Sequence, residues 1–186
     1  MASGTLFIVA TPLGNLEDMT FRAVRILKQA DLIAAEDTRH SKKLLAHYNI
    51  DSRLISCHEH NEEKRALQII DHLRQGKTIA LITDAGTPCI SDPGYRLVKA
   101  AAREKIPVIP VPGCSAVAAG LSVSGLPSDS FLFVGFLPRK KQQMAGAIKN
   151  LEHEKATLIF YESPRRIRVL VEQLRQELSS KVRVAD

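Results

Sequence analysis

The chain leaves one of its apolar runs through an unusual turn, the stretch ITDAGTPCISDPG at residues 82–94. The turn carries two glycines, two prolines and two aspartates, residue types that end both strands and helices. Ala85, Gly86 and Pro88 have small or rigid side chains, so a ligand could come close to the backbone. This composition suits the binding of a small molecule through backbone polar groups. Alternatively, the glycines and prolines only end the strand.

A second turn of the same kind follows a later apolar run, where Pro112 and Gly113 precede Ser115 and Ala116. We expect the two turns to follow neighbouring strands and to lie side by side. None of the loops has the spacing Gly-x-Gly-x-x-Gly or Gly-x-x-x-x-Gly-Lys-Ser/Thr, the two commonest phosphate-cradling patterns. The sequence therefore favours a ligand without phosphate groups over a dinucleotide or a nucleoside triphosphate.

Glu36, Asp37, Thr38 and Arg39 leave another apolar run together. Two carboxylates at a strand end are costly to desolvate, which favours a functional role. Arg39 could bind a phosphate, and Glu36 or Asp37 could bind a ribose hydroxyl. In the structural alternative, Asp37 or Thr38 simply caps the next helix.

A further polar turn holds His58, His60 and Asn61. His58 could point towards a ligand as a proton acceptor. A metal site is disfavoured because no third ligand follows at a suitable spacing. Asn61 fits a helix cap better than a substrate contact, because Glu62 and Glu63 would lie in the first turn of that helix.

Short runs rich in Ile, Val, Leu or Phe alternate along the chain with amphipathic segments. The expected strands are residues 5–10, 31–35, 53–57, 77–83, 106–111, 130–136, 156–161 and 181–185. Three helices have readable ends: one from Asn61 to Gly76, one capped by Asp92 and reaching about residue 105, and one beginning at Ser163 and Pro164. This alternation predicts an α/β fold with a largely parallel sheet.

Turn-forming residues at positions 125–130 predict a domain boundary. We expect an N-terminal α/β domain at residues 1–126 and a C-terminal α/β domain at residues 127–186. The second domain would hold only about three strands and two helices, and it ends on a strand with nothing after it to cover it. We therefore expect the C-terminal domain to be truncated.

The charge of the 186 residues, net +6, is uneven. Residues 139–186 hold 11 Lys and Arg against 6 Asp and Glu, whereas residues 1–138 hold 15 against 14. A C-terminal basic surface could bind RNA phosphates, and a solvated helix face would explain it equally well. The basic residues concerned are Arg139, Lys140, Lys141, Arg165, Arg166 and Arg168.

Compartment and covalent chemistry follow from the remaining composition. The 3 cysteines form no Cys-x-x-Cys pair, so neither a disulfide framework nor a zinc site is expected. No window approaches eighteen consecutive apolar residues, and the start has no basic leader. We expect a cytoplasmic protein without a membrane span.

Seven loop motifs, taken in chain order, carry a family resemblance. They read TPLGNLED, AEDTR, HEHNE, DAGTPCISDPG, PGCSA, FVGFLPRK and FYESPRRI. The set closely resembles the ribosomal RNA small subunit methyltransferase I family, which comprises S-adenosylmethionine-dependent enzymes of the wider tetrapyrrole methylase fold. The resemblance runs across essentially the whole chain, and the match of seven separate loops makes it specific.

The resemblance implies two α/β domains with S-adenosylmethionine in the cleft between them, a homodimer, and 2'-O-methylation of a cytidine ribose in the decoding region of 16S ribosomal RNA. S-adenosylmethionine has no phosphate, which would explain the missing glycine fingerprints. The residues that the resemblance places at the cofactor are Asp84, Ala85, Gly86, Thr87, Pro88, Ile90, Ser115, Ala116, Tyr161 and Glu162.

Catalytic and substrate-binding roles are also expected. The expected catalytic residues are Glu36, Asp37, Arg39 and His58. The expected substrate-binding residues are Pro12, Gly14, Asn15, Thr38 and Asn61. Pro12, Gly14 and Asn15 occupy the place where the wider fold holds its substrate, and they could equally form a plain tight turn.

Two other functions remain open on the sequence. One is a methyltransferase acting on a tetrapyrrole, against which the first loop is poorer in glycine than expected and the basic C-terminal part has no obvious role. The other is a noncatalytic RNA-binding module that assists ribosome assembly. Members of the resembled family continue well beyond residue 186, so we expect this chain to bind the cofactor weakly or to be inactive.

Overall fold

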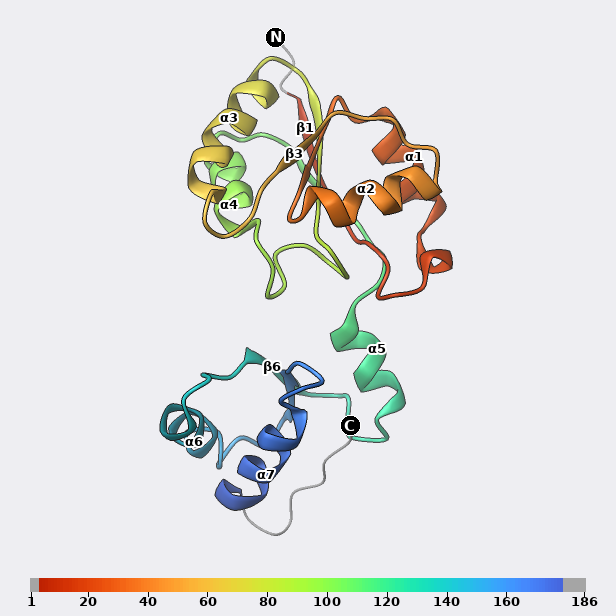
Figure 1. The fold of residues 1–186 in the computed structure, drawn as a ribbon. Coiled ribbons are helices and arrows are strands. Elements are labelled where there is room, and N and C mark those ends of the chain that lie inside the picture. The colour runs from red at the N-terminus through yellow and green to blue at the C-terminus, as the bar shows by residue number, and fades with distance from the viewer. Residues whose placement is uncertain (1–3, 179–186) are drawn as a thin grey trace. The chain divides into compact units, whose positions relative to one another are not determined.

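A computed structural model describes residues 4–178 of the chain, which divides into two compact units, residues 1–116 and 117–186 (Figure 1). The predicted division after residue 126 stays a prediction. Helix α5 (Ala116–Val123) lies between the two positions. The strand predicted at residues 181–185 lies outside the described residues.

The first unit is a five-stranded parallel sheet with helices on both faces (Figure 1). In sheet order the strands are β3 (Leu54–Ser56), β2 (Leu32–Ala35), β4 (Thr78–Ile82), β1 (Thr5–Val9) and β5 (Val108–Val111). The helices are the short 3-10 helix η1 (Leu16–Asp18), α1 (Phe21–Gln29), α2 (Thr38–His47), α3 (Glu62–Arg74) and α4 (Tyr95–Arg103). The α/β class with a parallel sheet, predicted from the sequence, is confirmed.

The two faces of the sheet bury alternate residues of the same strands, as the pleat requires. Ile33 and Ile82 pack with α1 and α2 in one core, whereas Leu32 and Leu81 pack with α3 and α4 in the other. Because both faces are covered, the central strands β2 and β4 are apolar apart from Thr78 rather than alternating. Figure 1 shows the two helix pairs on opposite sides of the sheet.

The strand order corrects one expectation. The turns at residues 84–88 and 112–116 follow β4 and β5, which were expected to be neighbours, but β1 lies between them. β4 differs from its neighbours in the face of the sheet on which its following helix lies. It leads to α4 on one face, whereas its true neighbours β2 and β1 lead to α2 and α1 on the other. In open parallel sheets, ligands bind beyond the carboxyl ends of strands whose connections separate in this way.

The described part of the second unit contains a parallel pair of strands, β6 (Phe131–Phe136) and β7 (Thr157–Tyr161), and the helices α5, α6 (Lys141–Lys149) and α7 (Ile167–Glu177). Met144, Ile148, Leu170 and Leu174 form its small core. The helix predicted to begin at Ser163 begins later, at Ile167, because residues 163–166 form a turn first. This unit carries the predicted residues Tyr161 and Glu162.

Candidate active site at the carboxyl ends of the strands

The loops after β1 and β4 are joined by a short antiparallel bridge. The Thr11 N–H donates to the Gly86 carbonyl at 2.9 Å, and the Gly86 N–H donates to the Thr11 carbonyl at 3.0 Å. The Thr11 hydroxyl also donates to the Thr83 carbonyl at 3.0 Å. Both polar groups of the Gly86 backbone are therefore used inside the protein. A ligand at this turn would meet Asp84, Ala85 and Thr87 instead.

The turn after β5 packs against the same place, although β5 does not adjoin β4. The Thr87 hydroxyl donates to the Cys114 carbonyl at 2.9 Å. A Cβ added to Gly86, whose φ is +88°, would lie 3.3 Å from Leu13 Cδ2 and 3.9 Å from the Cys114 carbonyl oxygen. The two small-residue turns thus lie side by side as expected, and Ser115 follows Cys114 directly.

The turn after β4 adopts an unusual backbone conformation. Four of its residues have positive φ: Gly86 (+88°), Gly94 (+132°) and, unexpectedly, Cys89 (+70°) and Ser91 (+65°). For residues with a side chain this conformation costs about 1–2 kcal/mol each. Backbone strain of this kind gathers at ligand-binding and catalytic sites. The two glycines indicate such a turn in the sequence, whereas the residue types of Cys89 and Ser91 do not indicate a positive φ.

Three carboxylates, those of Glu36, Asp84 and Asp92, gather at this edge of the sheet. The Thr83 hydroxyl donates to Glu36 Oε2 at 2.6 Å and also lies beside the Asp92 carboxyl. Asp84 Oδ1 accepts the Asp37 N–H at 3.2 Å. Because the strands are parallel, Glu36 after β2 and Asp84 after β4 emerge at the same edge. The structure therefore brings predicted residues from two loops into one acidic cluster.

Burial and neighbouring negative charges make two of these carboxyls, Asp84 and Asp92, easier to protonate than usual. Burial, followed by the negative charge of Glu36, raises the pKa of Asp92 to about 6. Burial also raises the pKa of Asp84, and the N–H of Asp37 opposes this shift. An acidic edge with raised pKa values is typical of a site that binds a cation or moves a proton.

Asp37 and Arg39 form a pair at the start of α2. Asp37 Oδ1 accepts the Arg39 N–H at 2.8 Å and so caps the helix, which is the structural alternative for this residue. The Arg39 guanidinium donates to both carboxylate oxygens, at 3.2 and 2.9 Å, and these bonds lower the pKa of Asp37 to about 2. The Arg39 side chain is still 90% exposed, and Thr38 is the first residue of α2.

His58 and Asn61 close the loop after the edge strand β3. Asn61 stands at the N-cap position of α3, as expected, but its side chain does not cap the helix. Asn61 Oδ1 accepts the His58 N–H at 2.9 Å, and Nδ2 lies 3.0 Å from His58 Nε2. The amide also donates to the Ser56 hydroxyl at 3.2 Å. His58 is thereby oriented, and its catalytic role stays a prediction.

Asp92 was expected to cap the helix that follows it, and this is wrong. α4 begins at Tyr95, and the cap comes from Glu62 of α3, whose Oε1 accepts the N–H groups of Gly94 at 3.0 Å and Arg96 at 2.7 Å. Glu62 is buried. Sequence reasoning missed it because the cap lies far along the chain from the helix it serves. Asp92 is left free to join the acidic cluster.

The first loop has a local role. Asn15 Oδ1 accepts the Glu17 N–H at 3.2 Å and caps η1, while Pro12 is buried and Gly14 has a φ of +105°. These features fit the tight-turn alternative, and Gly14 and Asn15 remain exposed. Their part in substrate binding stays a prediction.

The predicted residues of the second unit have partners of their own. The Tyr161 ring makes edge contacts with Phe133 and Phe136, with ring centroids 4.8 and 5.6 Å apart. Glu162 pairs with Arg166 at 3.3 Å, which neutralises one cation of the predicted C-terminal basic surface. The other residues of that basic surface are exposed. Contact of Tyr161 and Glu162 with a cofactor stays a prediction.

A sequence profile of the tetrapyrrole (corrin/porphyrin) methylases matches residues 5–185. The chain belongs to this tetrapyrrole methylase family. Members of the family use S-adenosylmethionine as methyl donor.

Two relatives show which tetrapyrrole methylases this chain resembles in sequence. The chain is 59% identical over 165 residues to a protein of Halalkalibacterium halodurans named ribosomal RNA small subunit methyltransferase I, covering 89% of this chain and 57% of the relative. It is 52% identical over 167 residues to a protein of the same name from Pseudomonas aeruginosa, covering 90% and 59%. The chain thus spans little more than half the length of these relatives.

The fold of this tetrapyrrole methylase matches solved structures as well. A cobalt precorrin-4 methyltransferase aligns with a TM-score of 0.67 at 18% identity, over 93% of this chain and 74% of that one. At this identity the likeness concerns the fold alone.

The acidic cluster fits the methyl donor of the tetrapyrrole methylases. S-adenosylmethionine carries a sulfonium and an ammonium cation and no phosphate. Glu36, Asp84 and Asp92 would attract such cations, and they would repel a phosphate group. Among residues 4–178, no group of three or more His, Cys, Asp or Glu residues is placed to hold a metal ion. No helix in the described part of the chain is long and apolar enough to cross a membrane.

Proposed function

We propose that this protein transfers the methyl group of S-adenosylmethionine to the ribose 2'-oxygen of a cytidine in the decoding region of 16S ribosomal RNA. The observation that carries the proposal is the 59% identity over 165 residues to a protein named for this ribosomal RNA. The acidic edge after β4, which has no phosphate-binding loop, supports S-adenosylmethionine as the methyl donor. Since the chain spans 57% of that relative, the proposal extends the relative's activity to a shorter chain.

The donor is proposed to lie on the two joined turns. Its cations would face Asp84, and its remaining atoms would lie against Ala85, Thr87, Pro88 and Ile90, of which Ala85 and Ile90 are exposed. Gly86 stabilises the turn through its backbone bridge to Thr11. The second turn would contribute Ser115 and Ala116. Together these residues hold the donor without a phosphate-binding loop.

The chain's own groups would prepare the acceptor. S-adenosylmethionine, when bound, would supply an electrophilic methyl group to an oxygen nucleophile that lies in line with the departing thioether sulfur. The demand on the protein is therefore alignment of the ribose oxygen at about 3 Å, with a group to take its proton. Asp92 is suited to take it, because a carboxyl whose pKa is about 6 accepts a proton more readily at neutral pH than an ordinary one.

Arg39 and the remaining predicted residues complete the proposal. The exposed guanidinium of Arg39 would bind a backbone phosphate of the RNA, oriented by Asp37. His58 is the second candidate for the proton, since Asn61 fixes its ring. The proposed partner is the small ribosomal subunit in the cytoplasm, with the protein acting as a homodimer.

The decisive experiment incubates the protein with S-adenosylmethionine labelled on the methyl group and small ribosomal subunits that lack the modification. We expect label on one cytidine, resistant to removal of the base, because it sits on the ribose. Label on a base, or label only on a tetrapyrrole offered in parallel, would contradict the proposal. Retained RNA affinity without any transfer would favour a noncatalytic assembly role.

A further inference from the structure

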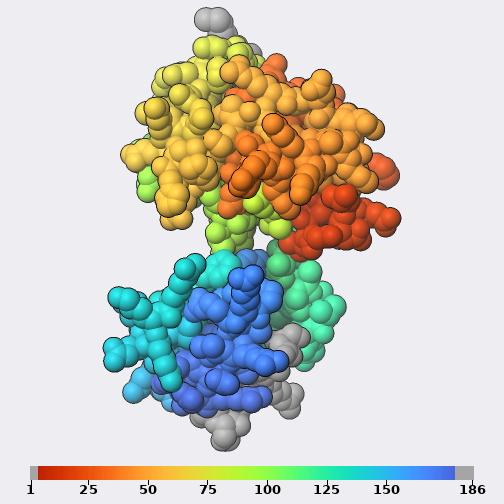
Figure 2. Space-filling view, viewed as in Figure 1, coloured from red at the N-terminus to blue at the C-terminus, as the bar shows by residue number. Residues whose placement is uncertain are grey.

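Two helices on one face of the first unit carry charge of a single sign. The helices α1 and α2 pack on the same side of the sheet, and neither contains Asp or Glu. Their outer surfaces instead present six exposed cations. These are Arg22, Arg25, Lys28, Arg39, Lys42 and Lys43. We call these six residues, together with Phe21, the basic face. Figure 2 shows the orange segment that includes α2 on the outer surface of the unit.

The cations of the basic face are largely unneutralised. Among residues 4–178, only Arg39 of the six forms an ion pair, with its neighbour Asp37. The opposite face differs, because there Arg96 pairs with Glu63 at 3.1 Å and Arg74 with Glu104 at 2.9 Å. The positive charge of α1 and α2 is therefore available to a partner.

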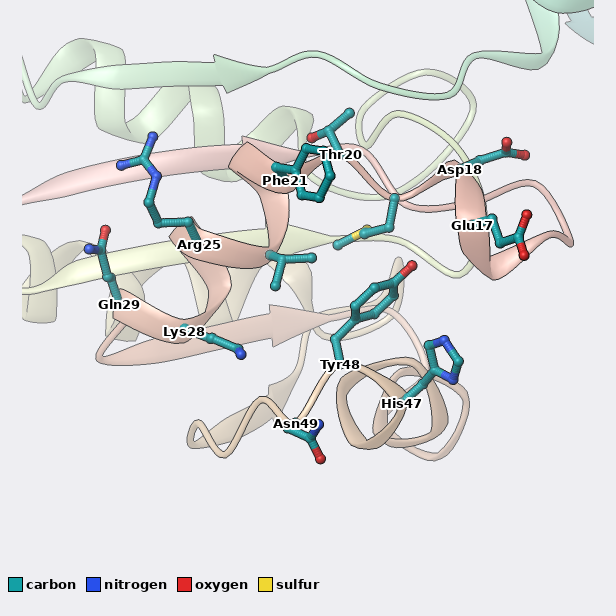
Figure 3. Close-up of a pocket in the computed structure, with 12 residues that line it drawn as sticks. Glu17, Asp18, Thr20, Phe21, Arg25, Lys28, Gln29, His47, Tyr48 and Asn49 are labelled. Atoms are coloured by element: carbon teal, nitrogen blue, oxygen red, sulfur yellow. The ribbon is translucent and has the colours of Figure 1, made fainter.

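An aromatic side chain stands on the same surface. Phe21, the first residue of α1, is 98% exposed, so it takes no part in the core. It lines a groove together with Arg25 and Lys28 of α1 and with Tyr48 after α2, while Glu17 and Asp18 of η1 line one end of the same groove (Figure 3). The Tyr48 hydroxyl donates to the Leu16 carbonyl and so fixes that wall. An exposed aromatic ring among cations is the pattern that holds single-stranded nucleic acid, with a base on the ring and phosphates on Lys and Arg.

We propose that the basic face binds a single-stranded segment of ribosomal RNA, with one base stacked on Phe21. The inference rests on the proposed function, which identifies the polyanion as ribosomal RNA. It adds the surface of the protein that binds this RNA. A lipid surface fits less well. The apolar sides of α1 and α2, including Leu27 and Leu45, are buried in the core, which leaves Phe21 alone to enter a membrane.

The charge contribution is tested with two matched double variants. Arg25→Gln with Lys28→Gln removes two cations from the basic face, and Lys99→Gln with Arg103→Gln removes two exposed cations from α4 on the opposite side. Affinity for a fluorescent single-stranded fragment of small-subunit ribosomal RNA is measured by anisotropy over a range of salt. We expect the first variant to bind about tenfold more weakly, with a salt slope lower by about 1.4, and the second to change little.

The stacking contribution has its own matched pair. Phe21→Ala removes the ring of the basic face, and Tyr95→Ala removes an aromatic ring that is 63% exposed on α4. Each stacked base contributes affinity, so we expect about a tenfold loss for Phe21→Ala and less than about twofold for Tyr95→Ala. All six positions are exposed, and melting temperatures of the variants confirm that the fold is kept.

The outcomes separate this surface from the proposed function. If the unaltered protein methylates and binds the RNA but the paired variants behave alike, the surface is wrong and the function stands. If the unaltered protein neither binds nor methylates RNA, both fail. If the basic-face variants lose binding to anionic phosphatidylglycerol vesicles while their RNA affinity is unchanged, the basic face binds a membrane and the inference is overturned.

Discussion

The Thr83 hydroxyl is the residue-scale feature with the largest chemical consequence. It lies between Glu36, to which it donates at 2.6 Å, and Asp92. One hydroxyl has a single proton, so it cannot donate to both carboxylates at once. When both are ionised, one of them lacks this donor and faces the other's charge. The raised pKa of Asp92, about 6, follows from this burial and crowding.

Replacing Asp92 by Asn should make stability less dependent on pH. The pKa of Asp92 in the folded protein, about 6, lies above its ordinary value of 3.8, so the native state binds more protons between these values and loses stability as pH rises from about 4 to 6. Asn cannot ionise. We expect Asp92→Asn to be more stable at pH 7, by on the order of 1 kcal/mol after allowance for solvent screening.

Urea unfolding of both proteins at pH 4 and pH 7 measures this effect. The stabilisation by Asn should be present at pH 7 and largely absent at pH 4, where Asp92 is protonated. An equal difference at the two pH values would show that Asp92 does not carry the charge penalty. Asp71→Asn, on the exposed side of α3, is the control for a carboxylate lost outside the cluster.

Arg39→Ala should act on Asp37 and on RNA, but not on the donor. The guanidinium holds the pKa of Asp37 at about 2, so its loss lets that pKa rise towards the ordinary value, visible by NMR titration of the carboxyl carbon. Under the proposed function, RNA turnover falls several-fold while affinity for S-adenosylmethionine is unchanged. Lys105→Ala, an exposed cation after α4, serves as control. Normal turnover in Arg39→Ala would remove Arg39 from the site.

At the scale of elements, α4 depends on a residue of α3. Glu62 accepts two N–H groups at the start of α4, while Glu63 beside it is 84% exposed and only pairs with Arg96. Glu62→Ala should cost about 1–2 kcal/mol of unfolding free energy, because it leaves buried N–H donors without a partner. Glu63→Ala should cost less than about 0.5 kcal/mol. Equal losses in urea unfolding would refute this capping role.

Elements were predictable where local pattern decides them. The strands at residues 5–10 and 77–83, for example, differ from β1 and β4 only at their ends, since apolar runs bounded by turn formers determine them. The order of the strands was not predictable, because it depends on contacts between distant segments. The same reason hid the Glu62 cap and led to the incorrect assignment of Asp92.

At the scale of the molecule, averaging along the sequence concealed the charge pattern. Residues 1–138 are nearly neutral in total, so the sequence directed attention to the C-terminal part. In the fold, the acids of the first unit gather at the strand ends and on α3, while α1 and α2 keep only cations. Which residues share a face is set by the packing of helices on the sheet. The seven loop motifs, by contrast, are local, and they indicated the family directly.

The chemical class of the ligand is a property of the whole edge of the sheet, and it yields a final prediction. Glu36, Asp84 and Asp92 favour a cation and disfavour phosphates, so S-adenosylmethionine should raise the melting temperature, whereas ATP and NADH should not. At a hundredfold excess over its dissociation constant a ligand adds about 2.7 kcal/mol, or about 5–10 °C for a folded chain of about 150–250 residues.

Gly86→Ala connects this ligand-induced shift to the joined turns. Its Cβ would lie 3.3 Å from Leu13 Cδ2 on a residue whose φ is +88°, so the turn must distort and the shift caused by S-adenosylmethionine should shrink. Gly146→Ala, in open space on α6, should leave the shift unchanged. A full shift in Gly86→Ala, or an equal shift with ATP, would mean that the donor does not bind where the loops after β1, β4 and β5 meet.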